Sequence, residues 1–199
     1  MAGGWSSIFL PKALPCHHSV YCREACSKLE PGMENKIVLP NCEPNTFKFF
    51  LQWMYEPILP EHYDFEVQDD VWDGLRAWVL GDRLQASGFK DSVMERIYNE
   101  HSMMTDDYFE LLPGDLDLCD WKAKPGSSLR NFVMDTMSQQ WVFGKKFQLI
   151  KEQWIDHLDE IPKIRGGIFC AMAGIGSNGD GLPEIKPLAT YLEGPEVEF

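Results

Sequence analysis

Hydrophobic residues recur at helical spacing through most of this chain, and the clearest pattern follows Pro44. Four of them are three or four residues apart and so share one face of a helix: Phe47, Phe50, Leu51 and Met54. Pro44 suits the first turn of a helix, because the N–H that proline lacks would have no partner there. The pattern predicts a helix from Pro44 to Tyr55 that packs through this stripe.

Two more aromatic residues, Phe49 and Trp53, lie one helical turn apart on the flank away from that stripe. Two interpretations remain open for them. In one, helices from the C-terminal half of the chain cover the pair, which then belongs to the core. In the other, the pair anchors a protein partner, because aromatic side chains dominate binding hot spots. We name Phe49 and Trp53 as the predicted partner-binding residues.

The segments on both sides of this helix predict further elements. Short β-prone runs, expected as strands, occupy residues 7–12 and 36–39. Amphipathic helices are expected at residues 19–29, 71–86 and 89–100, with glycine or proline beside their ends.

The second half of the chain begins with a change in composition. Residues 105–126 hold six acidic residues, two prolines and two glycines, which predicts an acidic linker. Two or three amphipathic helices are expected within residues 127–178, the last of them opened by Pro162. Residues 179–199 are rich in glycine, proline and glutamate and are predicted to form a mobile tail.

Three short motifs stand in an order that resembles one protein family. The first is Cys-His-His-Ser-Val-Tyr-Cys-Arg at residues 16–23. The second is Leu39-Pro40 followed by the pattern F-x-x-F-L-x-W-x-Y, and the third is Trp-Val-Leu-Gly-Asp-Arg-Leu at residues 78–84. In this order they resemble the BTB/POZ domain, with the overall character of its fungal members. The resemblance covers residues 8 to 100, about half of the chain.

This resemblance implies an α+β, mainly helical fold. A BTB/POZ-like core of a short sheet with helices would occupy residues 1–104, followed by the linker, the helical extension and the tail. The family normally begins with one more strand, and only six residues precede the first β-prone run here, so the core is expected to be N-terminally shortened. The implied function is a protein–protein interaction module. Family members self-associate, and some act as substrate adaptors for cullin-3 ubiquitin ligases.

Composition and charge narrow the classes of partner. The formal charge of −13 argues against general nucleic-acid binding, which depends on neutralising phosphates with Lys and Arg. No apolar run reaches the roughly 18 residues that a membrane span needs, and the first ten residues are a poor signal peptide. Six cysteines without a regular framework favour a reducing intracellular compartment, the cytoplasm or the nucleus.

Two segments offer an alternative function, as an enzyme or a ligand-binding protein. Cysteine and histidine cluster within residues 16–26, and both are preferred zinc ligands, but their spacing fits no familiar zinc motif. Residues 174–181 contain G-x-G-x-x-G, which binds dinucleotides only where a strand precedes it and a helix begins there. Neither context is predicted. We therefore expect no catalysis, no cofactor, no metal and no small-molecule substrate.

Overall fold

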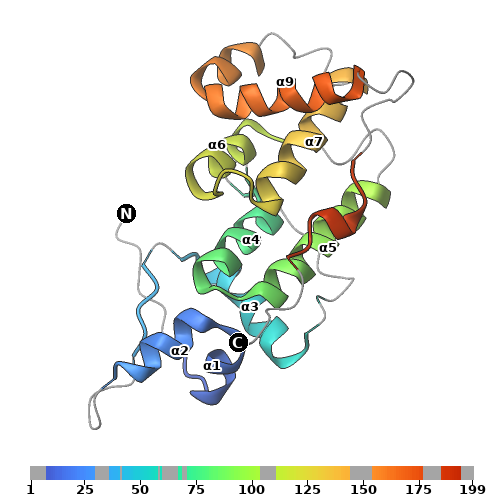
Figure 1. Ribbon diagram of the computed structural model, residues 1–199. Coiled ribbons are helices and arrows are strands. Elements are labelled where there is room, and N and C mark those ends of the chain that lie inside the picture. The colour runs from blue at the N-terminus through green and yellow to red at the C-terminus, as the bar shows by residue number, and fades with distance from the viewer. Residues whose placement is uncertain are drawn as a thin grey trace.

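A computed structural model describes residues 8–29, 36–40, 42–57, 59, 67–68, 71–103, 111–143, 154–176 and 185–193. The fold is mainly helical (Figure 1). The helices are α1 (Ala13–His18), α2 (Val20–Ser27), α3 (Pro44–Tyr55), α4 (Asp73–Leu84), α5 (Ser87–Met103), α6 (Pro113–Lys122), α7 (Ser128–Phe143) and α9 (Pro162–Gly176). Residues 154–160 are also helical, and η1 (Leu188–Thr190) is a 3-10 turn. Strands β1 (Val67–Gln68) and β2 (Val71–Trp72) pair antiparallel over two residues each.

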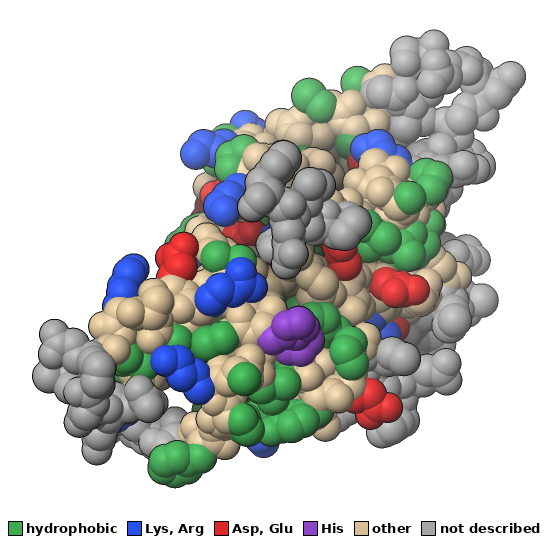
Figure 2. All heavy atoms as spheres, turned by 60° about the horizontal axis from the view of Figure 1, so that its bottom comes forward, with side chains coloured by type: hydrophobic (Ala, Val, Ile, Leu, Met, Phe, Trp, Pro, Cys, Tyr) green, Lys and Arg blue, Asp and Glu red, His purple; other side chains and the backbone are tan. Residues whose placement is uncertain are grey.

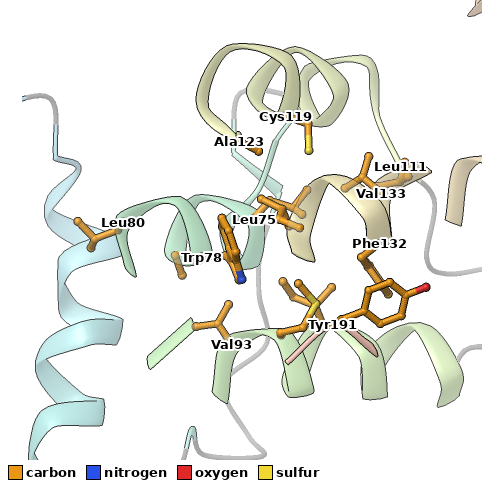
Figure 3. Close-up of a cluster of buried hydrophobic side chains, with 14 of the residues drawn as sticks. Leu75, Trp78, Leu80, Val93, Leu111, Cys119, Ala123, Phe132, Val133 and Tyr191 are labelled. Atoms are coloured by element: carbon orange, nitrogen blue, oxygen red, sulfur yellow. The ribbon is translucent and has the colours of Figure 1, made fainter. Parts of the chain in front are cut away.

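The helices stack along one direction (Figure 1). Helices α1, α2 and α3 form one end, α4 and α5 form the middle, and α6, α7 and α9 form the other end. A continuous hydrophobic core runs through all three parts. Figure 3 shows its centre, where side chains from α4, α5, α6 and α7 meet. Those labelled there include Leu75, Trp78, Val93, Cys119, Phe132 and Val133.

The corner between α4 and α5 is tight. Gln85 adopts a left-handed conformation with φ of 51°, the only positive φ among the described residues other than glycine. Its N–H donates to Asp82 O at 3.2 Å, and the N–H of Ala86 donates to Gly81 O at 3.0 Å. These two bonds satisfy the last carbonyls of α4 in the manner of a Schellman motif. The motif turns the chain at once into α5, which packs along α4.

The helices expected from the hydrophobic spacing are confirmed within a few residues by α2, α3, α4, α5, α7 and α9. The two expected strands are not. Residues 8–10 and 36–39 have no regular structure and no ladder partner among the described residues, so the backbone pairing that would stabilise a strand is missing there. The α+β class therefore reduces to a mainly helical fold with one very short ladder.

Helix α3 is rotated from its predicted orientation. We expected Phe47 and Leu51 to face inward, but both are only partly buried. The buried residues of α3 are Thr46, Phe49, Phe50, Trp53 and Met54. The reason is that α3 is covered on two sides, by α1 and by the α4–α5 pair. Phe49 and Trp53, on the flank away from the predicted stripe, are therefore buried in this orientation.

The segment predicted as an acidic linker instead contains α6. Asp115 is fully buried, and its two oxygens accept the N–H groups of Trp72 and Leu112 at 2.9 and 2.8 Å. Asp120 accepts from the buried Arg130 at 3.0 Å. Two acidic residues of the predicted linker therefore hold α6 against β2 and α7. The remaining part of the predicted linker, residues 105–110, lies outside the described residues.

The predicted mobile tail also packs in part. Residues 185–193, which we call the strap, lie along α5 (Figure 1). Tyr191 is fully buried, and its ring joins the core with the hydroxyl directed outward (Figure 3). That hydroxyl donates to Asp135 Oδ2 at 2.6 Å and accepts from the N–H of Lys186 at 3.1 Å. One aromatic residue thus fixes this stretch to α5 and α7.

Candidate interaction surface

A single buried serine joins two helix corners at the α1–α3 end. Ser19 caps α2, because its Oγ accepts the N–H of Cys22 at 3.0 Å. The same Oγ donates to the carbonyl of Leu84, in the last turn of α4, at 2.6 Å. Nearby, the N–H of Val20 donates to Gln85 O at 3.4 Å. The α1–α2 corner is therefore held directly against the α4–α5 corner.

An open pocket of about 170 Å³ lies where these corners meet. Its lining comes from four helices and one corner residue: His17, His18, Val20, Arg23, Trp53, Gln85, Ser87 and Gly88. None of these lining residues is Asp or Glu, although the whole chain carries a formal charge of −13. The pocket thus differs in charge from the molecule that contains it.

Arg23 and one helix end give the pocket its positive character, and two histidines share the lining. Arg23 is exposed, and its Nε–H donates to Cys16 O at 3.1 Å, which fixes the base of the guanidinium. His17 and His18 lie beside it with ring centroids 4.7 Å apart. Partial burial, and then the neighbouring His17, lower the pKa of His18 below its ordinary value. His18 is therefore largely neutral at pH 7 and can offer a hydrogen bond rather than a charge.

The N-terminus of α5 also opens into the pocket. The first backbone bond of α5 runs from Lys90 N–H to Ala86 O, so the N–H groups of Ser87, Gly88 and Phe89 have no acceptor within the helix itself. The residue before the helix is Ala86, whose side chain cannot accept a hydrogen bond. A helix of this length places partial positive charge at its N-terminus. The backbone N–H groups at this helix end and the side chain of Arg23 therefore both favour a negatively charged ligand in the pocket.

The two predicted partner-binding residues take different positions. Trp53 lines the pocket, lies edge-to-face against His18 with ring centroids 4.9 Å apart, and donates from Nε1 to Ser92 Oγ at 2.9 Å. Phe49 does not line the pocket. Only 6% of Trp53 and 5% of Phe49 is exposed, which favours the core interpretation. The ring of Trp53 contacts His18 of α1 and Phe89 of α5, whereas we expected the C-terminal helices to cover the pair. Their part in partner binding stays a prediction.

Exposed hydrophobic side chains gather on the same end of the molecule. Figure 2 looks at this end and shows hydrophobic side chains around a histidine surface, with Lys and Arg on one flank. The large hydrophobic residues exposed on the segments that form this end are Ile8, Phe9, Val38 and Tyr55. Phe9 is 96% exposed and Tyr55 is 64% exposed. We call these four residues the apolar rim.

The cysteines of residues 16–26 take positions typical of small core residues. Cys22 and Cys26 are buried, and burial raises the pKa of both thiols. Cys16 Sγ lies 3.7 Å from the carbonyl oxygen of Cys22. Across the described ranges, no three His, Cys, Asp or Glu side chains are grouped closely enough to hold a metal ion. The geometry gives the zinc alternative no support.

Within the described residues, the glycine-rich segment forms the end of a helix. Gly174 and Gly176 form the last turn of α9, and the residues from 177 to 181 lie outside the described part of the chain. Pyrophosphate binds at a helix N-terminus, whereas this glycine run stands at a C-terminus. The described part of this segment therefore gives the dinucleotide alternative no support.

Sequence reasoning missed the pocket itself. Its residues come from positions 17 to 88, and no local pattern connects Arg23 with Ser87 or Gly88. One available signal was the charge of the N-terminal segment. Residues 8–29 carry three basic side chains against the single acid Glu24, in a chain that is otherwise strongly acidic.

Two broader results complete the description of the molecule. No helix in the described ranges combines the length and the apolar character that crossing a membrane requires. Comparison of the chain with models of protein families, with curated proteins and with solved structures finds no match.

Proposed function

We propose that this chain is a protein–protein interaction module and that it binds its partner through the α1–α3 end. The observation that carries the proposal is the apolar rim, Ile8, Phe9, Val38 and Tyr55, on the same end of the molecule as a pocket whose lining has no acidic residue. Exposed apolar side chains grouped with polar neighbours are typical of protein-binding surfaces. Tyrosine and phenylalanine are also enriched at such interfaces.

The finer proposal is an adaptor of the BTB/POZ kind, which self-associates or links a substrate to a cullin-3 ubiquitin ligase. Its support is the resemblance of the three motifs, which fall on α1–α2, on α3 and on α4 in the family's order. The absence of regular strands at residues 8–10 and 36–39 weighs against a complete BTB/POZ sheet. Interaction through helices is the part of the proposal that does not depend on that sheet.

The test is affinity capture from native extract with the wild type and two variants, followed by mass spectrometry. Phe9→Ser combined with Tyr55→Ser removes the two most exposed aromatic residues of the rim, and both changes should leave the fold intact because these side chains bury little. Phe169→Ser is the matched control, since Phe169 is 51% exposed on α9 at the other end of the molecule. We expect the double variant to lose captured proteins that the control retains.

Two direct measurements separate the finer alternatives. Binding of purified cullin-3 tests the adaptor hypothesis, and sedimentation analysis over a range of concentrations tests self-association. If the double variant and the control capture the same proteins as the wild type, the α1–α3 end is not the binding surface and the proposal is wrong.

A further inference from the structure

We infer that the pocket between the α1–α2 and α4–α5 corners is a carboxylate-binding site, which receives an Asp or Glu side chain from an acidic segment of a protein partner. This inference rests on the proposed function for the source of the carboxylate. It adds the chemical class of the partner and the residues that recognise it.

The lining provides several donors and no competing carboxylate. Arg23 supplies a full positive charge, and its Nε bond to Cys16 O leaves the outer guanidinium nitrogens directed away from that carbonyl. Ser87 and Gly88 contribute the first N–H groups of α5, and a helix N-terminus favours negative charge. Charge-assisted hydrogen bonds of this kind are about twice as strong as neutral ones.

The frame of the pocket is fixed before any ligand arrives. Ser19 Oγ joins α2 to Leu84 O at 2.6 Å, and Trp53 is held on the opposite side by its bond to Ser92. The left-handed Gln85 keeps the start of α5 at the pocket. Donors that are already in place bind an anion without the entropic cost of ordering them.

The size and surroundings of the site favour a protein side chain. A cavity of about 170 Å³ that opens to solvent accommodates the end of one side chain, while the rest of the ligand must continue outside. The apolar rim supplies hydrophobic contacts for such a continuing chain.

The test is a titration of the full-length protein with a fluorescein-labelled peptide, Gly-Asp-Glu-Glu-Gly, followed by fluorescence anisotropy. The control peptide, Gly-Asn-Gln-Gln-Gly, has the same shape without charge. Arg23→Gln should weaken binding of the acidic peptide about ten-fold or more, because it removes one charge-assisted contact. Lys28→Gln is the matched control, since it removes the same charge from an exposed position of the same segment outside the pocket. It should change the affinity less than three-fold at physiological salt.

A second variant keeps the result independent of folding. Ser87→Asp places a carboxylate in the pocket at the N-terminus of α5, where negative charge stabilises a helix. This variant should melt at the wild-type temperature or above it and still lose the acidic peptide. Loss of binding without loss of stability cannot come from damage to the fold.

Several results would overturn the inference. They are equal affinity for the two peptides, equal weakening by Arg23→Gln and Lys28→Gln, or full binding by Ser87→Asp. Absence of binding at 1 mM peptide, or displacement of the peptide by inorganic phosphate at equimolar concentration, would also overturn it. If the pocket variants have no effect while the Phe9 and Tyr55 double variant still loses its partners, the inference falls and the proposed function stands.

Discussion

Replacing Tyr191 with alanine should destabilise the whole protein, although this residue lies in a segment that the sequence marks as a tail. The Tyr191 ring is fully buried against Phe132, with centroids 5.4 Å apart at right angles, and against Tyr98 at 6.2 Å. Its hydroxyl donates to Asp135 and accepts from the backbone of Lys186. The side chain therefore contributes both hydrophobic burial and a satisfied polar network.

The expected size of the effect follows from these contacts. Changing a buried aromatic residue to alanine costs about 3–5 kcal/mol in a rigid core. The strap is short, so it can detach and let water reach the groove, which places the expected loss near the lower end, about 3 kcal/mol. Tyr191→Phe keeps the ring but leaves the N–H of Lys186 without an acceptor and Asp135 with one donor fewer. That change should cost about 1–2 kcal/mol.

Urea unfolding followed by tryptophan fluorescence measures both effects, because the chain contains seven tryptophans. Tyr55→Ala is the matched control, since this tyrosine is 64% exposed and its loss should change the free energy of unfolding by less than about 0.5 kcal/mol. A lower slope of free energy against urea for Tyr191→Ala would indicate that the strap has left the native state. If Tyr191→Ala is as stable as the control, the strap is not part of the core and the reasoning is wrong.

Four further changes test other parts of the structure. Burial lowers the pKa of His101 from 6.5 to about 4, so the unfolded state takes up a proton first as the pH falls. The free energy of unfolding should therefore decrease by about 2 kcal/mol between pH 7 and pH 5. Urea titrations at both pH values should show this decrease for the wild type and not for His101→Gln. Burial and the neighbouring carboxylate raise the pKa of Tyr191, so stability should also fall as the pH rises past about 10, and Tyr191→Phe should show a smaller fall. Gln85→Gly should stabilise the protein by about 1 kcal/mol or less and so raise its melting temperature, because glycine adopts the left-handed conformation without strain. A lower melting temperature would contradict this. Gly81→Ala should lower the free energy of unfolding by about 1–3 kcal/mol, because its Cβ would lie 2.7 Å from a side-chain carbon of α5. Gly166→Ala meets open space and should raise it by up to about 1 kcal/mol. Equal effects of the two changes in calorimetry would refute the close packing of α4 and α5.

Local signals predicted the helices because the physics that forms them is local. Pro162 opens α9 as expected, and Ser19 stands at the N-cap of α2. In α7, Leu129, Phe132 and Val133 stand three and four residues apart and are all buried, as hydrophobic spacing requires.

The features that the sequence did not predict depend on distant neighbours. Helix α3 is apolar on most of its surface, so periodicity cannot decide whether the Phe47 or the Phe49 side is covered; α1 and α5 decide it. Tyr191 is a single aromatic residue among glycines and prolines and has no periodic partner. Asp115 counts as a solvated charge in the composition, yet it is buried because two backbone N–H groups converge on it. The pocket could not be predicted for the same reason, because the residues that line it are up to 71 positions apart along the chain.

The hydroxyl of Ser19 restricts which residues can occupy that position as sequences diverge. The residues usually found at an N-cap position are serine, threonine, asparagine, aspartate and glycine. Here the side chain must also donate to the carbonyl of Leu84, and it is fully buried while it does so. Aspartate has no proton to donate at neutral pH, glycine has no side chain, and asparagine places its donor on a longer arm. In related sequences that keep this corner, position 19 should therefore vary only between serine and threonine, and an aspartate there would indicate that the two corners have separated.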